Sequence, residues 1–188
     1  VFYKTFKNPI SLQYLNSSNP EFQYANVDEG TIGGIELELR KTLGFIAPAF
    51  DKFKISTNLT FITSTMDVIE QSGLEPESRP FEGQSPLLAN LSLGYLNPDS
   101  KWDIQVSYNY TGERLAVVGL NSPDIYERGL STLDAVISKK LGNVSLKFAA
   151  NNLLNPNYTT SSEYLGQEYL TRQYKKGTSF VLSVAYEL

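Results

Sequence analysis

The chain has 188 residues, including 12 tyrosines and 10 phenylalanines, no cysteine and no histidine, and its net charge is −4. The absence of cysteine and histidine excludes disulfides, thiolate zinc sites and thiol or imidazole catalysis. The acidic balance argues against nucleic-acid binding, which needs a basic face. No apolar run approaches eighteen residues, so the sequence predicts no transmembrane helix.

Apolar and polar residues alternate along most of the chain. The segment GIELELRK (34–41) alternates aliphatic with mostly charged residues, and 53–61, 90–95, 102–111 and 144–149 repeat the alternation. This period of two predicts β-strands with one apolar and one polar face. We predict about eight strands: 1–8, 21–46, 51–66, 85–97, 101–118, 130–141, 143–153 and 168–188. In the longest of these, the Gly33–Gly34 pair predicts a β-bulge.

The connections between these strands alternate between short and long. The short ones, APAF, NPDS and the Gly142–Asn143 pair, are rich in turn-forming residues. The long ones are polar and cover 9–20, 67–84, 119–129 and 154–167. Such alternation is typical of an antiparallel up-and-down barrel of the outer-membrane type, which has short turns at one end and long loops at the other. A tilted strand of about ten residues would rise roughly 23 Å, close to the apolar band of such a barrel.

The alternation also predicts which residues face lipid. Charged and amide side chains are costly in lipid, so the polar face should line a wet or plugged lumen. In the strand 51–66 we therefore expect one set of residues outside and the other inside. The outward set is Phe53, Ile55, Leu59 and Phe61, and the lumenal set is Lys54, Ser56, Asn58 and Thr60. Aromatic residues near strand ends that suit interfacial girdles are Tyr95, Trp102, Tyr110, Tyr158 and Tyr186.

Both ends of the chain read as strand. TSFVLSVAYEL (178–188) keeps its alternation to the last residue, as expected where a final strand pairs with the first strand of a barrel. VFYKTFKNPI (1–10) starts in what reads as the middle of a strand, so we expect the carboxy-terminal piece of a larger protein. The lumenal charges would be costly in the dry interior of an eight-stranded barrel. We therefore expect an open arc, in which 178–188 pairs with 143–153 and not with 1–8.

Several motifs occur in an order that resembles a known family. FEGQSPLLANLSLGYLNPDSKWDIQVSYNYTGERLAVVGLNSPDIYERG is followed by LDAVISKKLGNVSLKFAANNLLNP. The order is G-Q-S-P, two strands around an N-P turn, Y-N-Y-x-G-x-R, P-D-x-Y-E, L-D-x-x-x-S-K-K-L and A-x-N-L-L-N-P. Together with FYKTFKNPI and GGIELELRKTLGF, these motifs resemble the carboxy-terminal barrel of TonB-dependent outer-membrane receptors, in the style found in Bacteroidota.

The resemblance implies a twenty-two-stranded barrel with an amino-terminal plug, which imports a scarce nutrient with energy delivered by TonB. Residues 1–188 would form about the last eight strands of that one barrel domain, without the plug and the amino-terminal strands. The implied partners are outer-membrane lipid, the missing strands and plug, TonB, the barrel assembly machinery and, as a further candidate, a surface lipoprotein. Siderophores, vitamins and glycans all remain open as substrates.

The sequence predicts no catalytic site, no metal site and no cofactor. Glu36 and Glu38 are expected to be lumenal charges, and Asp28 with Glu29 offers too few oxygens for calcium. The candidates for ligand contact lie in the loop GLNSPDIYERGLS and are Asp124, Tyr126, Glu127 and Arg128, with loop packing as the alternative. Two other functions stay open: a complete eight-stranded barrel with a structural or adhesive role, and a lipocalin-like ligand binder.

Overall fold

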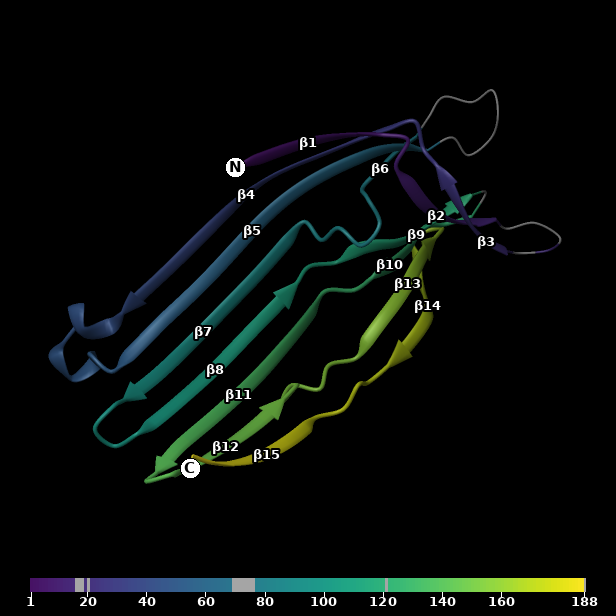
Figure 1. Cartoon of the computed structure of the whole chain (residues 1–188). Helices are drawn as coiled ribbons and strands as arrows, with labels where there is room; N and C mark the ends of the chain where they lie inside the picture. The colour runs from purple at the N-terminus through teal and green to yellow at the C-terminus, as the bar shows by residue number, and fades with distance from the viewer. Residues whose placement is uncertain (16–18, 20, 69–76, 121, 188) are drawn as a thin grey trace.

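The computed structural model describes residues 1–15, 19, 21–68, 77–120 and 122–187. These ranges hold fifteen β-strands and two short 3-10 helices (Figure 1). The strands are β1 (Phe2–Lys7), β2 (Ile10–Leu15), β3 (Glu21–Asn26), β4 (Glu29–Thr42), β5 (Phe53–Val68), β6 (Glu77–Arg79), β7 (Leu87–Asn97), β8 (Trp102–Thr111), β9 (Arg114–Leu120), β10 (Ile125–Glu127), β11 (Leu130–Leu141), β12 (Val144–Asn151), β13 (Tyr158–Tyr164), β14 (Gln167–Tyr174) and β15 (Ser179–Tyr186). The 3-10 helices are η1 (Leu43–Phe45) and η2 (Pro48–Phe50), both between β4 and β5. No helix in the described ranges is long and apolar enough to cross a membrane.

Eight strands form a curved wall, in the order β1-β4-β5-β7-β8-β11-β12-β15, and the short β6 pairs with the end of β5 (Figure 1). All neighbours in this wall sheet are antiparallel, and they match the eight strands that the alternation predicts. The last strand, β15, pairs with β12, and β1 pairs with β4. Among the described residues β15 does not pair with β1, so the prediction of an open arc is confirmed.

The register of the wall places apolar residues beside apolar residues. Phe61 lies opposite Ile35 on one side and Leu87 on the other, and Leu91 lies opposite Tyr108. The same rows continue through Ile104, Ile137, Phe148 and Leu182 to the edge strand β15. The outward set predicted for 53–61 therefore shares one face, here called the apolar face, and the predicted lumenal set shares the other.

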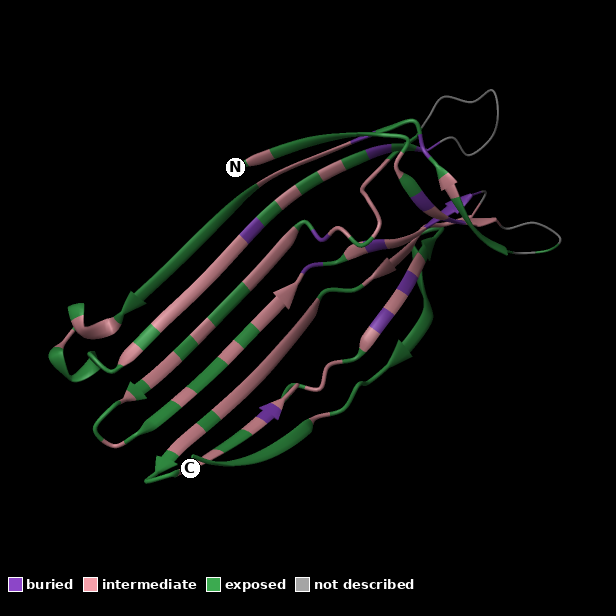
Figure 2. Cartoon of the chain, in the orientation of Figure 1, coloured by how far each residue is buried: buried purple, intermediate pink, exposed green. Residues whose placement is uncertain are grey.

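Both faces of the wall carry exposed side chains. Large side chains of the apolar face remain open to solvent, including Leu37, Leu91 and Leu182. On the polar face Thr60 is 6% exposed, while the Glu38 and Arg40 side chains are 53% and 68% exposed. Two hollows, of about 240 and 350 Å³, lie against this polar face; one is lined by Arg40, Lys54 and Gln105 and the other by Asp103 and Lys147, among others. A wider hollow of about 540 Å³ lies against Gly33, Ile35 and Phe61 on the apolar face. Figure 2 shows the alternating exposure along β5 and its neighbours.

The other six strands form a second sheet, here called the cap sheet, in the order β14-β13-β10-β9-β2-β3. It lies at the end of the wall opposite the tight turns (Figure 1). Its pairs are antiparallel except for β2 and β9, which run parallel through Gln13–Leu15 and Val118–Leu120. The hairpin of β2 and β3 thereby reaches from the β1–β4 side of the wall to the continuation of β8.

Three predicted strands are each split in two, because the chain leaves the wall to join the cap sheet. The predicted strand 21–46 becomes β3 and β4, separated where Val27 N–H donates to the Pro9 carbonyl (2.9 Å), and it ends at Thr42 in the turns η1 and η2. The strand 101–118 divides at Gly112, whose N–H donates to the Leu87 carbonyl (2.8 Å). The strand 168–188 divides between β14 and β15.

The predicted long connections were wrong in one respect: they contain strands. The connections 9–20, 67–84, 119–129 and 154–167 hold β2, β6, β10 and β13 in whole or in part. Their backbone groups are satisfied by pairing with one another in the cap sheet or, for β6, with β5. Parts of 9–20, 67–84 and 119–129, and the last residue of 168–188, lie outside the described residues.

The predicted bulge at Gly33–Gly34 is also wrong, since the ladder between β4 and β5 continues through this pair without a shift. The glycines leave room for aromatic rings instead. A Cβ on Gly34 would lie 2.6 Å from the Phe2 ring, and a Cβ on Gly30 would lie 2.3 Å from the Phe81 ring. Real Cβ atoms essentially never show contacts this short. At Gly34 the carbonyl oxygen of Phe61 is also 2.6 Å from the Cβ position, so a side chain there would force the backbone to shift, whereas at Gly30 the Phe81 ring would have to move.

A compact apolar core lies where the cap sheet meets the wall. It consists of Val27, Met66, Val68, Leu115, Val118 and Leu120, with Leu15, Phe81 and Tyr126 packed against it. Met66 and Val68 lie on the polar side of β5, because alternate residues of a strand share a face and both have the same parity as Asn58 and Thr60. The cap therefore packs over the polar face of the wall and leaves the apolar face uncovered.

Candidate functional site

The four candidates for ligand contact lie together in the cap, on β10 and its flanks. Asp124 precedes β10, Tyr126 and Glu127 belong to it, and Arg128 follows it. Each side chain is engaged by a residue from another part of the cap.

Asp124 closes the turn between β9 and β10 and ties it to β6. Its Oδ1 accepts the N–H of Gly119 (2.9 Å), and its Oδ2 accepts a charge-assisted bond from Nε of Arg79 (2.7 Å). The same guanidinium donates to Glu77 (2.8 Å). Both members of the Arg79–Asp124 pair are largely buried, with side chains 19% and 12% exposed. The Asp124 carboxylate therefore joins the turn between β9 and β10 to the β6 segment.

Glu127 and Arg114 form a pair across β9 and β10. Oε2 of Glu127 accepts from Nη2 of Arg114 (2.7 Å) and from its Nε (3.0 Å). The guanidinium also donates to the Gly83 carbonyl (3.3 Å) from the segment that precedes β7. Arg114 therefore links its own strand, β9, to β10 and to the segment around Gly83.

Arg128 binds β14. Its guanidinium is paired with the carboxylate of Glu168, with Nε 2.8 Å from Oε1, and its N–H donates to the Thr159 carbonyl (2.9 Å). The hydrogen bond from Arg128, together with one from Ser161, lowers the pKa of Glu168 to about 2. This pair joins the β10 segment to the β13–β14 hairpin.

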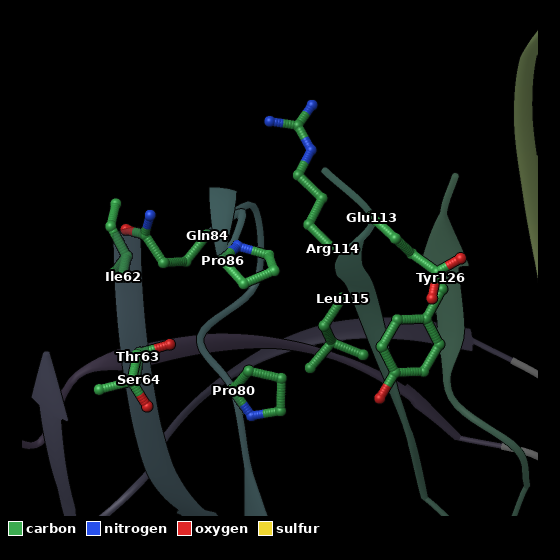
Figure 3. Close-up of a pocket in the computed structure, with 10 residues that line it drawn as sticks. All are labelled: Ile62, Thr63, Ser64, Pro80, Gln84, Pro86, Glu113, Arg114, Leu115 and Tyr126. Carbon is green, nitrogen blue, oxygen red and sulfur yellow. The ribbon is translucent and has the colours of Figure 1, made fainter. Parts of the chain in front are cut away.

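Tyr126 turns toward the core beneath the cap, against which its ring packs. Burial raises the pKa of its phenol, and the Asp124 carboxylate adds to the shift. The ring also lines a cavity of about 250 Å³ between β5, the segment 80–86 and β9 (Figure 3). Other lining residues include Leu115, Arg114 and Gln84.

The structure thus brings all four candidates into one cluster and gives each an internal partner or packing site. The loop-packing alternative is observed in these contacts, while ligand contact stays a prediction. Sequence reasoning missed the partners Arg79, Arg114 and Glu168, and also Ser11, whose buried hydroxyl donates to Glu82. No local pattern identifies these residues, because each partner comes from a different strand or loop.

The other polar residues considered from sequence do not gather into a chemical site. Within the described ranges, no group of three or more Asp and Glu side chains is arranged to hold a metal ion. Glu38 pairs with Arg40 on the polar face (2.7 Å), as a lumenal charge would. Asp28 lies at the base of the β2–β3 hairpin, where its carbonyl accepts the N–H of Asn8 (2.9 Å).

Comparison with known proteins identifies the class. Residues 1–153 match the family described as TonB dependent receptor-like, beta-barrel. The match covers most of the chain, so the protein belongs to this family of outer-membrane receptors and transporters. The family is one of receptors, not of enzymes. The narrower similarity to receptors of Bacteroidota stays a prediction.

Individual relatives agree with this assignment. The chain is 24% identical over 191 residues to a probable hemoglobin and hemoglobin-haptoglobin-binding protein 4 of Haemophilus influenzae, covering 85% of this chain and 18% of that protein. It superposes on the siderophore receptor PiuA from Acinetobacter baumannii with a TM-score of 0.61 and 20% identity, over 98% of this chain and 25% of that one. Its superposition on the copper transporter OprC has a TM-score of 0.64 and 16% identity, and covers 98% of this chain and 27% of that one. Its superposition on the FrpB iron transporter from Neisseria meningitidis has a TM-score of 0.63 and 17% identity, and covers 98% of this chain and 26% of that one. The chain thus spans about a quarter of the length of these solved structures and less than a fifth of the curated relative.

Proposed function

We propose that this chain forms part of the barrel wall and the external loops of a TonB-dependent receptor that takes up a scarce nutrient across the outer membrane. The observation that carries the proposal is the uninterrupted apolar face of the wall, on a chain that belongs to this family. Leu37, Leu91 and Leu182, on three different wall strands, are 55%, 45% and 71% exposed. An exposed apolar surface of this extent suits contact with lipid.

The edge of the apolar face near the tight turns has the chemistry of a membrane interface. Nζ of Lys139 lies 4.7 Å from the centre of the Trp102 ring, and Lys41 lies over Phe45 at 5.8 Å. The Phe53 and Tyr95 rings pack beside each other at 5.0 Å. Aromatic rings and amphipathic cations are favoured at headgroup level, where one end is apolar and the other is wet. This edge would face the periplasm.

In this proposal the polar face lines the lumen, and the cap covers its external mouth. Charges such as Glu36, Lys54 and Lys147 would then face water or a plug, where ionised groups carry little desolvation cost. The Asp124, Glu127 and Arg128 contacts join three of the external connections, and the pairing of β2 with β9 adds the fourth. A nutrient that enters from outside would meet this cap first.

The two alternative functions are less well supported. A complete eight-stranded barrel would need β1 and β15 to pair, and among the described residues they do not. A lipocalin-like binder would turn its apolar face inward around a ligand, whereas here the cap core packs on the polar side of β5 and large side chains of the apolar face stay exposed. The similarity to receptors about four times as long favours one segment of a larger barrel domain.

The proposed partners follow from that role. They are outer-membrane lipid, the remaining barrel strands and plug of the same protein, TonB, the barrel assembly machinery during insertion, and a surface lipoprotein as a further candidate. The names of the relatives point to haemoglobin, siderophores, iron and copper as nutrients of those proteins. For this chain, iron chelates, vitamins and glycans are all candidate substrates. We propose no catalytic activity and no resident cofactor.

A transport assay tests the proposal. The complete receptor is produced in an outer-membrane host with and without TonB, and growth is measured on panels of iron chelates, vitamins and glycans supplied as limiting nutrients. We expect at least one nutrient to support growth only when the receptor and TonB are both present. Growth that never depends on the receptor, or that persists without TonB, would contradict the proposal.

A further inference from the structure

One hollow on the polar face of the wall is lined by hydrogen-bond donors and by no acidic residue. It measures about 240 Å³ and lies across β4, β5, β7 and β8 near the tight turns. Its lining residues are Arg40, Lys54, Ser56, Ser92, Gly94 and Gln105. The other hollow of this face includes Asp103, and the cavity beneath the cap includes Glu113. Of these three spaces in the described part of the chain, the hollow around Gly94 has the lining best suited to an anion.

The register of the wall brings these side chains together. Gly94 of β7 lies between Lys54 of β5 and Gln105 of β8 in the ladder. The next row of the polar face, two residues along each strand, supplies the rest of the lining. Its members are Arg40, Ser56 and Ser92. The space above Gly94 is thus surrounded by two cations, two hydroxyls and one amide, all of which can donate hydrogen bonds.

The positive charge of this hollow is only partly neutralised by the protein. Oε1 of Glu38 lies 2.7 Å from Nε of Arg40, and both side chains are more than half exposed. Lys54 is exposed on the polar face and forms no ion pair within the described ranges. The hollow therefore keeps the charge of Lys54 for an occupant that comes from the lumen.

Gly94 keeps the hollow open, although neither packing nor backbone conformation in the described structure requires a glycine there. The nearest atoms that a Cβ would meet are the carbonyl oxygens of Lys54 and Ile104, at the ordinary contact distances of 3.8 and 3.9 Å. The residue has no positive φ, and the ladder passes through it without a shift. A glycine inside a strand weakens the strand and often marks a place where a ligand or another backbone approaches closely.

We propose that this hollow binds a carboxylate group of the transported nutrient on the lumenal side of the wall. The inference rests on the proposed transport function and adds a substrate class to it, namely a nutrient or nutrient chelate that carries a carboxylate. Arg40 and Lys54 supply charge-assisted hydrogen bonds, which are about twice as strong as neutral ones. A space of about 240 Å³ has room for a small organic acid. Because the hollow lies near the edge that would face the periplasm, the nutrient would reach it late in its passage.

The test is an NMR titration of the complete receptor in detergent with isotope-labelled succinate at neutral pH. One partly exposed ion pair contributes up to a factor of about five in affinity, so the Lys54→Gln variant should bind succinate about fivefold more weakly than the wild type. The matched control is Lys147→Gln, which removes the same charge from the same face, in the hollow that also contains Asp103. The control variant should bind succinate like the wild type.

Further arms test the hollow itself and the charge of the ligand. The Gly94→Leu variant fills the space and should abolish succinate binding while the receptor still folds, because a Cβ at this position meets no close contact. Succinamide, which carries no charge, should not bind to the wild type. Inorganic phosphate should bind more weakly than succinate.

Three results would overturn the proposal. They are equal succinate affinities of the Lys54→Gln and Lys147→Gln variants, binding of succinamide or phosphate as tight as that of succinate, and a Gly94→Leu receptor that fails to fold. The last result would mean that another part of the protein occupies the hollow. TonB-dependent growth of cells with the wild-type receptor tests the transport function separately, so these results would refute this inference alone.

Discussion

The core beneath the cap should unfold independently of the wall when Leu115 is shortened. Leu115 is 0% exposed and contacts residues from both sheets, so Leu115→Ala leaves a cavity that the surrounding strands cannot fully close. Such truncations cost about 3 kcal/mol. Since about 1.4 kcal/mol corresponds to a factor of ten in an equilibrium constant, opening of the cap should become about a hundredfold more frequent.

Amide hydrogen exchange of the complete receptor in detergent measures this opening. Protection should fall by about that factor in β2, β9 and β10 and remain unchanged in β7 and β8. The matched control is Leu91→Ala on the apolar face, where the side chain is 45% exposed and leaves no internal cavity. Unchanged protection of β9, or an equal loss throughout the wall, would refute the assignment of a separate cap core.

Three further predictions concern single contacts. The pKa of Glu168 is lowered to about 2, so its pair with Arg128 should stabilise the cap fully above about pH 4.5 and be lost as the pH falls toward 2. Amide hydrogen exchange of β14 should therefore depend on pH in this range, and Glu168→Gln should remove that dependence. A pH profile that Glu168→Gln leaves unchanged would count against the pair. Asp124→Ala and Asp124→Asn both remove the carboxylate that pairs with the largely buried Arg79, so both should speed proteolysis of the cap severalfold, and an Asp124→Asn variant cleaved at the wild-type rate would contradict the charge-pair account. Gly34→Ala would place a Cβ 2.6 Å from the Phe2 ring and should lower the thermal stability of the receptor, and a variant as stable as the wild type would contradict the packing role.

The wall could be predicted from sequence because its information is local. Alternation along 102–111 or 144–149 determines which residues share a face, and a slip of one residue would turn Phe61 toward the lumen. Tight turns such as NPDS then order neighbouring strands. All eight wall strands follow from these local signals, and the open edges at β1 and β15 follow from the cost of placing the polar-face charges inside an eight-stranded barrel.

The cap could not be predicted in the same way because its strands are short and their partners are distant. β6 and β10 have three residues each, too few for a period of two to be recognised. β2 pairs in parallel with β9 across more than half of the chain, and no turn residue marks that pairing. We therefore predicted loops at the positions of these short strands.

The candidate cluster was placed in the correct loop, but its contacts depend on the cap. Asp124 and Arg128 stood out as charged residues in a connection between strands, which is a local signal. Their partners Arg79 and Glu168 come from other connections, so only the folded cap brings them together. The Gly33–Gly34 bulge was wrong for a related reason, since the ring that occupies the space at Gly34 belongs to β1.

The central claim is that the apolar face contacts lipid and the polar face lines an aqueous lumen. Because this segment contains no cysteine, a single cysteine at Leu91 or at the adjacent Ser92 can carry a fluorescent label in the reconstituted receptor. The label at Leu91 should be quenched by brominated acyl chains and not by aqueous iodide, and the label at Ser92 should show the opposite result. Quenching of the Ser92 label by brominated lipid, with the Leu91 label open to iodide, would contradict the account.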